Sequence, residues 1–158
     1  MTMTKRQTGF TIVELLIVIV VIGILAAITI VAFNGIQSRA RDTERATDMS
    51  NIKKKLELFH AQNGYYPSSA QVTNATFRQD VLQLPTDTVK PPGATGTISY
   101  CWPSAGNTNV YCYVGYRAAG IPENCTADGE QCLAYTLSYR AESDPATLVR
   151  INSSVDNR

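Results

Sequence analysis

One carboxylate stands inside a long apolar stretch of this chain, and it is the residue there most able to do chemistry. Glu14 is the single charged residue between Phe10 and Phe33. A carboxylate on a lipid-facing helix costs about 2.5–3.5 kcal/mol on membrane insertion, so such a group marks a candidate functional site. Near the helix start it could instead reach the lipid headgroups at little cost. Glu14 therefore fits either an ion pair inside an apolar assembly or the interfacial end of an anchor helix.

The four cysteines are the next chemically distinctive group. They are Cys101, Cys112, Cys125 and Cys132. An even number of cysteines behind an apolar N-terminal segment favours two disulfides in an exported domain. A zinc site is the alternative, but no CxxC pair is present. We therefore predict disulfides and no metal site.

The remaining polar residues do not form a catalytic set. His60 is the only histidine, and it fits a surface position on a helix. The sequence has no Ser/His/Asp set, metal cluster or phosphate-binding loop, so we predict that the chain is not an enzyme and needs no cofactor. The net charge of +1 gives no general reason to expect a nucleic-acid partner. Acids intersperse the basic residues from Arg39 to Lys55, which predicts a solvated helix face, with DNA binding as the alternative.

The elements that carry these residues begin with a short basic segment and a long apolar run. Residues 1–9 are polar and include Lys5 and Arg6. Residues 10–33 are long enough to cross a bilayer, which needs roughly 20 helical residues. A conventional secretory signal would have a shorter apolar core followed by a small-residue cleavage site. An uncleaved anchor fits the hydropathy equally well.

Residues 34–63 are expected to continue the same helix with an amphipathic face. Four apolar residues recur at helical spacing on that face: Met49, Ile52, Leu56 and Phe59. No proline precedes Pro67, and Asn63-Gly64 forms a good helix stop. Asn34-Gly35 is the weakest point inside the helix, because glycine costs about 1 kcal/mol there relative to alanine.

Residues 64–158 are expected to form a globular head. Prolines and glycines interrupt its first part, where a short helix is expected around Phe77–Leu82. Four strand-like runs then follow: Thr97–Trp102, Val110–Arg117, Gln131–Tyr139 and Thr147–Ile151.

An antiparallel pairing of the first two runs would place Cys101 opposite Cys112. The same register would pair Tyr100 with Tyr113, Trp102 with Tyr111, and Ile98 with Gly115. The cysteines would then share one face, and the aromatic residues would bury against the apolar face of the helix. We therefore predict a Cys101–Cys112 disulfide. A hairpin without this bond is the alternative.

The other two cysteines flank a short loop. Cys125 and Cys132 enclose Asp128-Gly129, and we predict that they form the second disulfide. Four cysteines permit three pairings, so the other two connectivities stay open here.

The segment Gly9-Phe10-Thr11-Ile12-Val13-Glu14 resembles the processing site of type IV pilins and related pseudopilins. The apolar run after it and the segment HAQNGYYPSS, which would close the helix, resemble the same family. The resemblance covers about residues 5–67. It implies that a prepilin peptidase cuts after Gly9 and N-methylates Phe10, and that Glu14 is then the fifth residue. Pilins of this kind often hold their C-terminal region with disulfides, which fits Cys125 and Cys132.

One departure concerns the middle of the apolar run. Many major pilins have a proline about twenty residues into the mature helix, where this chain reads Thr29-Ile30-Val31-Ala32. Its absence weighs against a major filament subunit.

These observations predict an α+β protein in which a long N-terminal helix packs on a four-stranded antiparallel sheet. The expected parts are a leader (1–9), a membrane and polymerisation half of the helix (10–33), an amphipathic half (34–63) and the head (64–158). The resemblance implies a structural subunit of an extracellular filament used in motility, adhesion or DNA uptake. Its partners would be copies of itself, other pilins, the peptidase, the assembly machinery and, before assembly, the inner-membrane bilayer. A minor pilin, a secretion pseudopilin and a monomeric membrane-anchored binding domain are the alternatives.

Overall fold

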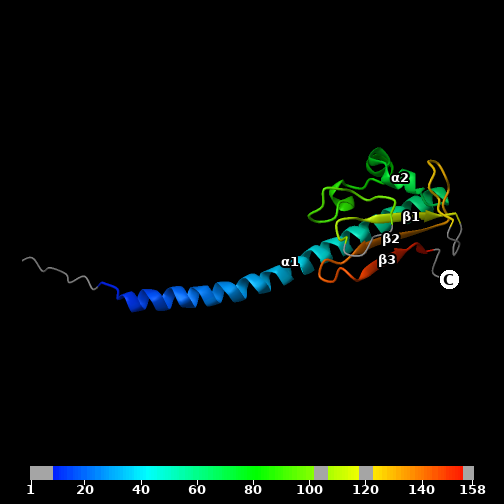
Figure 1. The fold of residues 1–158 in the computed structure, drawn as a ribbon. Helices are drawn as coiled ribbons and strands as arrows, with labels where there is room; N and C mark the ends of the chain where they lie inside the picture. The colour runs from blue at the N-terminus through cyan, green and yellow to red at the C-terminus, as the bar shows by residue number, and fades with distance from the viewer. Residues whose placement is uncertain (1–8, 102–106, 118–122, 155–158) are drawn as a thin grey trace, which may run out of the picture. The chain divides into compact units, whose positions relative to one another are not determined.

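The computed structural model describes residues 9–101, 107–117 and 123–154 (Figure 1). The chain divides into two compact units, Met1–Gln37 and Ser38–Arg158. Helix α1, Ile12–Asn63, contributes its first part to one unit and its remainder to the other. No proline interrupts this stretch, and Asn34-Gly35 is helical.

Helix α1 ends where the sequence predicts. Gly64 has a φ of 82°, a left-handed conformation that glycine adopts without steric cost. Its N–H donates to the His60 carbonyl at 2.7 Å, and the Asn63 side-chain amide donates to the Phe59 carbonyl at 2.9 Å. These bonds satisfy carbonyl groups that the last turn of the helix leaves without partners.

Three short helical turns follow α1 in the second unit. They are α2 (Ser69–Thr73), the π-helical turn η1 (Phe77–Val81) and the 3₁₀ turn η2 (Asp87–Val89). A capping box opens α2, because the side chains of Ser68 and Gln71 each accept from the other's backbone N–H. The short helix expected around Phe77–Leu82 corresponds to η1.

The sheet has three antiparallel strands in the order β1-β2-β3. They are β1 (Cys112–Tyr116), β2 (Ala134–Arg140) and β3 (Leu148–Asn152). Leu137 of β2 lies between Tyr113 of β1 and Ile151 of β3. The predicted α+β class is therefore confirmed, with three strands in place of four.

The segment predicted as the first strand does not form the expected hairpin. Ser99 makes one isolated parallel bridge to Cys112, so the antiparallel register that set Cys101 opposite Cys112 is wrong. The segment Asn124–Cys125 occupies the end of β1 on the edge that does not pair with β2. The Cys125 N–H donates to the Gly115 carbonyl at 2.8 Å, and Asn124 bridges Tyr116. Little of that edge remains for another strand.

The side-chain pairs expected from that register are wrong as well. The Tyr100 hydroxyl accepts a hydrogen bond from the Asn124 side chain at 2.7 Å and does not face Tyr113. The N–H of Gly115 donates to the Ser69 hydroxyl at 3.1 Å. The predicted pairing of Trp102 lies outside the described residues.

The core of the second unit lies between α1 and the sheet. The predicted apolar face of α1 is confirmed, because Met49, Ile52 and Leu56 are fully buried. Five residues on or beside the strands belong to the same cluster: Tyr111, Tyr113, Tyr135, Leu137 and Tyr139. Figure 1 shows the later turns of α1 running alongside the strands.

Candidate assembly site

Glu14 lies in the first turn of α1 and caps that end of the helix. Its carboxylate accepts hydrogen bonds from the backbone N–H and the hydroxyl of Thr11, both at 2.8 Å. The Thr11 hydroxyl accepts from the Glu14 N–H at 3.3 Å. This capping box satisfies N–H groups that have no partner inside the helix. Thr11 is not among the predicted site residues, although the Thr-x-x-Glu spacing signals a capping box.

The expected cleavage point directly precedes this cap and is exposed. Phe10 has 90% of its surface exposed, and nothing lies within 4 Å of the position that a Cβ on Gly9 would take. Both partners of the capping box follow Phe10 in the sequence. A cut between Gly9 and Phe10 would therefore create a new amine one residue before the cap and leave Thr11 in place.

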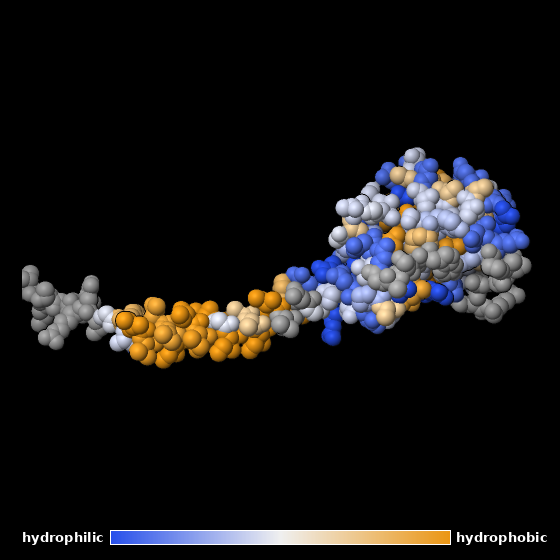
Figure 2. Space-filling model, viewed as in Figure 1, coloured by the Kyte–Doolittle hydropathy of each residue, from blue (hydrophilic) through white to orange (hydrophobic). Residues whose placement is uncertain are grey.

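The first part of α1 presents an apolar surface that this chain does not cover. Every large apolar side chain that the structure describes from Phe10 to Ile30 is exposed (Figure 2). Within the described residues, α1 is the one helix long and apolar enough to cross a membrane. Removing apolar surface from water is worth about 25 cal/mol per Å², so lipid or other protein must cover this segment.

A network of charges fastens the β2–β3 loop to α1. Arg45 is fully buried and forms ion pairs with Asp42 at 2.9 Å and Glu142 at 3.0 Å. Arg41 also pairs with Glu142. The backbone N–H groups of Glu142 and Ser143 donate to Asp42 at 2.7 and 2.9 Å. The prediction of a solvated basic face is therefore wrong for Arg45, whereas Arg41 keeps 36% of its side chain exposed.

Burial and hydrogen bonding act in opposite directions on Asp42. Burial raises the pKa of the Asp42 carboxyl, but hydrogen bonds from Glu142, Ser143 and Arg45 outweigh it and leave the pKa below its ordinary value. Asp42 therefore stays ionised as the anion opposite buried Arg45. The sequence gives little sign of this network, because Glu142 is far from α1 along the chain.

Glu57 joins three parts of the second unit. Its two carboxylate oxygens accept from the Tyr66 hydroxyl at 2.8 Å and the Tyr135 hydroxyl at 3.0 Å. They also accept from the N–H and the hydroxyl of Ser154, at 3.1 and 2.7 Å. Burial raises the pKa of Glu57, but these hydrogen bonds outweigh it and keep the pKa below its ordinary value. The carboxylate thus links α1, β2 and the last described residue.

Two disulfides close the head, with the connectivity expected from the sequence. Cys101 is bonded to Cys112, with Cα atoms 5.0 Å apart, and Cys125 to Cys132, at 5.9 Å. Tyr66 exchanges backbone hydrogen bonds with Cys132, at 2.7 and 3.0 Å. The second disulfide loop is therefore held against the segment that directly follows α1.

The N-terminal part of this site is similar to that of known proteins. Residues 4–30 match a family model described as the Prokaryotic N-terminal methylation motif. That range contains Gly9, Phe10, Thr11 and Glu14, together with most of the exposed apolar segment. No solved structure matches the chain.

Curated relatives match over part of the chain. A type II secretion system core protein G of Pectobacterium carotovorum subsp. carotovorum is 30% identical over 87 residues, which are 52% of this chain and 56% of the relative. The protein of the same name in Escherichia coli is 31% identical over 68 residues, 43% of this chain and 47% of the relative. A fimbrial protein of Neisseria meningitidis is 35% identical over 77 residues, 47% of this chain and 45% of the relative.

This chain spans about half the length of the curated relatives that it matches. The chain combines a helix long and apolar enough to cross a membrane with a sheet-bearing head, and its start matches the methylation motif. Over part of its length the chain is thus similar to a type II secretion system core protein and to a fimbrial protein, and its N-terminus matches the methylation motif.

Proposed function

We propose that this chain is a structural subunit of a type IV pilus-like filament. A membrane-held precursor is cut between Gly9 and Phe10, Phe10 is N-methylated, and the processed subunit polymerises through the apolar part of α1. The precursor lies in the inner membrane, and the assembled filament lies outside the cell. The peptidase, the assembly machinery and other pilins are the partners that this role requires. The role is structural and needs no catalytic residue.

The observation that carries this proposal is the sequence Gly9-Phe10 directly before Glu14 at the start of an exposed apolar helix. Lipid can cover the helix in the precursor, and neighbouring helices can cover it in a filament. A helical array of identical subunits uses heterologous contacts that do not close, so its length is unlimited.

Glu14 sets the register between subunits in this proposal. In a bundle of apolar helices its carboxylate needs a cation, and the amine of a neighbour's Phe10 supplies one. Breaking a buried ion pair costs about 3–5 kcal/mol because one charge is left alone. Subunits that place the amine beside Glu14 are therefore favoured over subunits shifted along the helix.

A pseudopilin of a type II secretion system, or a minor pilin, is the second candidate. Its support is that relatives in several bacteria are named type II secretion system core protein G. The lack of a proline at Thr29–Ala32 points the same way. Both candidates share the processing site and the role of Glu14, and they differ in where the filament ends and what it serves.

The test combines mass analysis with fractionation of cells. We expect the mature protein in sheared filaments to begin at methylated Phe10. We expect Glu14→Ala to remain in the membrane with both disulfides formed and to be lost from the sheared fraction. Glu44→Ala removes an exposed carboxylate elsewhere on α1 and serves as the matched control. A mature chain that retains Lys5 and Arg6, or normal filaments from Glu14→Ala, contradicts the proposal.

Deleting the chain separates a pilus subunit, major or minor, from a secretion pseudopilin. Loss of surface filaments with normal protein export supports a pilus subunit. Loss of export with intact surface filaments supports a secretion pseudopilin.

A further inference from the structure

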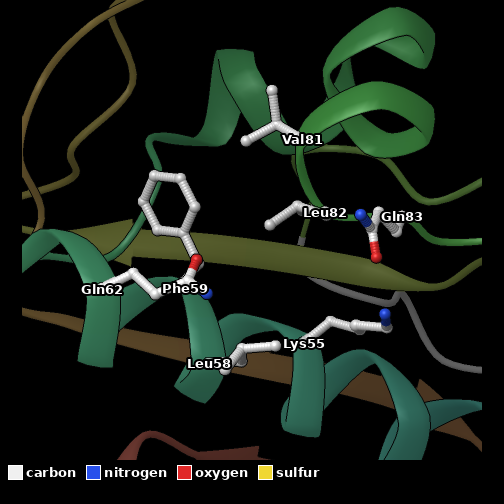
Figure 3. Close-up of a pocket in the computed structure, with 7 residues that line it drawn as sticks. All are labelled: Lys55, Leu58, Phe59, Gln62, Val81, Leu82 and Gln83. Carbon is white, nitrogen blue, oxygen red and sulfur yellow. The ribbon is translucent and has the colours of Figure 1, made fainter.

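A small depression opens on the surface of the second unit between α1 and the segment that follows η1 (Figure 3). Its volume is about 70 Å³, and its lining consists of Lys55, Leu58, Phe59, Gln62, Val81, Leu82 and Gln83. Sites for small molecules usually measure about 300–1,000 Å³. This depression therefore suits the end of one protein side chain better than a free ligand.

The depression contains two of the few large apolar side chains that the second unit leaves exposed. Leu58 is 52% exposed and Val81 is 50% exposed, whereas Phe59 and Leu82 beneath them are buried. Among the described residues from Ser38 onward, the other exposed large apolar side chains are Tyr100 and Leu133. Exposed apolar side chains beside a mainly polar hollow are typical of a protein contact surface.

The rim of the depression is positively charged. Lys55 lines it, whereas Lys53 and Lys54, on the same turn of α1, point about 160° and 100° away around the helix. Glu57, the nearest acid along the helix, is already bound by Tyr66, Tyr135 and Ser154. None of the three lysines forms an ion pair with another described residue.

A surface with the complementary character lies on the second disulfide loop. Residues 123–133 include Glu123, Asp128 and Glu130 and no lysine or arginine. Glu123 and Asp128 form no ion pair within the described part of the chain, whereas Glu130 pairs with Arg117. Half-exposed Leu133 stands directly after the loop.

The second disulfide loop is already ordered in the isolated chain. The Cys125–Cys132 disulfide closes it, and backbone hydrogen bonds join Cys125 to Ser69 and Cys132 to Tyr66. A segment that is already ordered loses little conformational entropy when it binds.

We propose that the Lys53–Lys55 turn and the Leu58–Val81 depression of one subunit receive the acidic segment 123–133 of a second copy. This inference rests on the proposed filament function and names a contact between heads within the filament. Lys55 faces the carboxylate of Asp128, and Leu133 covers the exposed apolar side chains. The two surfaces differ, so the contact is heterologous and repeats from subunit to subunit.

Photo-crosslinking in the full-length chain tests the contact directly. Leu58 is replaced by benzoylphenylalanine in cells that make filaments, and the sheared and membrane fractions are irradiated, digested and analysed by mass spectrometry. We expect a crosslinked dimer in which position 58 is joined to the segment 123–133. The same photo-reactive residue at exposed Ala46 points about 120° away around α1 and should not yield this crosslink.

A charge exchange provides an independent test. Lys55→Glu and Asp128→Lys should each reduce the sheared fraction about threefold, the range expected for an exposed ion pair. The double variant should recover most of that loss. Lys90→Glu changes another exposed lysine and should have no effect. Both sites are at the surface, so membrane levels and disulfides should stay normal.

Each outcome has a distinct meaning. Wild-type chain that never enters a sheared fraction contradicts the proposed filament function. Filaments that form normally but crosslink position 58 to another segment overturn this contact alone. Lys55→Glu that assembles as wild type but loses retention on a DNA column would assign Lys55 to a polyanion and also overturn the contact.

Discussion

Glu14 has a role in the isolated chain besides the one proposed for the filament. It accepts two hydrogen bonds from Thr11 and so caps α1. The cap orders the first turn at the point where the new amine of Phe10 would appear. Because the cap uses one carboxylate oxygen, Oε2, the other oxygen is left for a cation from a neighbouring subunit.

Two substitutions separate the cap from the charge. Glutamine can replace glutamate at the third position of a capping box, whereas alanine cannot. We expect Glu14→Gln to keep the helix start ordered but to lose filaments as severely as Glu14→Ala. Quantifying the sheared fractions of both variants is the measurement. Filaments from Glu14→Gln at wild-type level would show that the cap, and not the charge, is what assembly requires.

Thr11→Ala completes the comparison, because it removes the hydroxyl from the cap and keeps the carboxylate. A lost cap costs about 0.5–2 kcal/mol of helix stability. A filament yield well above that of Glu14→Gln is therefore expected for Thr11→Ala.

Single residues differ in how well the sequence predicts them. The four cysteines were predictable because their type and number restrict the chemistry. Thr11 was missed, although a local spacing signals it. Arg45 could not be predicted, because its counter-ion Glu142 comes from a distant loop and only the folded chain brings the two together.

At the scale of elements, the second disulfide loop lies against β1 at a position that only glycine fits. A Cβ on Gly115 would stand 2.9 Å from the Cys132 sulfur and 3.3 Å from the Cys125 carbonyl oxygen. We expect Gly115→Ala to lower the free energy of unfolding by about 1–3 kcal/mol through overpacking. Gly96→Ala is the control, because nothing lies within 4 Å of its Cβ position. Denaturant unfolding checks both, and equal midpoints would contradict the close packing.

The link from Glu57 to β2 and Ser154 predicts a dependence of stability on pH. In the folded chain the pKa of Glu57 lies below its ordinary value. In the unfolded chain a glutamate has a pKa of about 4.3. Its contribution is therefore present above about pH 4.3 and is lost as the pH falls through the folded pKa. Burial, helped by Glu57, raises the pKa of Tyr66 to about 12, so the same cluster also loses stability above about pH 10.

Glu57→Gln tests this account. An amide offers one acceptor oxygen where the carboxylate offers two, so at pH 7 we expect a loss of about 1–3 kcal/mol from unsatisfied partners. The decline in melting temperature below pH 4.3 should become shallower than in the wild type. Glu44→Gln, at an exposed position, should change neither. If the melting temperature of Glu57→Gln falls below pH 4.3 as steeply as that of the wild type, Glu57 does not contribute to this pH dependence.

The sequence predicts α1 better than it predicts the pairing of the strands. The periodicity of Met49 to Phe59 and the Asn63-Gly64 stop gave the core face and the end of α1, because both signals are local. The run Thr97–Trp102 has strand-like composition, but its described residues, Thr97 to Cys101, form one parallel bridge and no strand. Strand pairing depends on what else occupies the edge of β1, and composition does not contain that information.

At the scale of the whole molecule, the mean hydropathy averages over two units of different character. The mean hydropathy of −0.08 is that of a soluble protein. The exposed large apolar residues, however, lie mostly in the unit Met1–Gln37, and the core cluster lies wholly in Ser38–Arg158. One unit thus needs an apolar environment, and the other carries its own core.

This division predicts that residues 38–158 fold without the first unit. The segment retains the core from Met49 onward, both disulfides, the Arg45 network and the Glu57 cluster. It loses nearly all the apolar surface that requires lipid or a neighbouring helix. We expect a chain beginning at Ser38 to be soluble and monomeric without detergent, with a cooperative thermal transition. The full chain under the same conditions should aggregate or require a membrane mimic, because burying its exposed helix is favourable at about 25 cal/mol per Å². Size-exclusion chromatography, circular dichroism and non-reducing peptide mapping check the expectation. An unfolded or mispaired truncated chain would mean that the head depends on the first unit to fold, and a soluble full-length monomer would contradict the role proposed for the apolar helix.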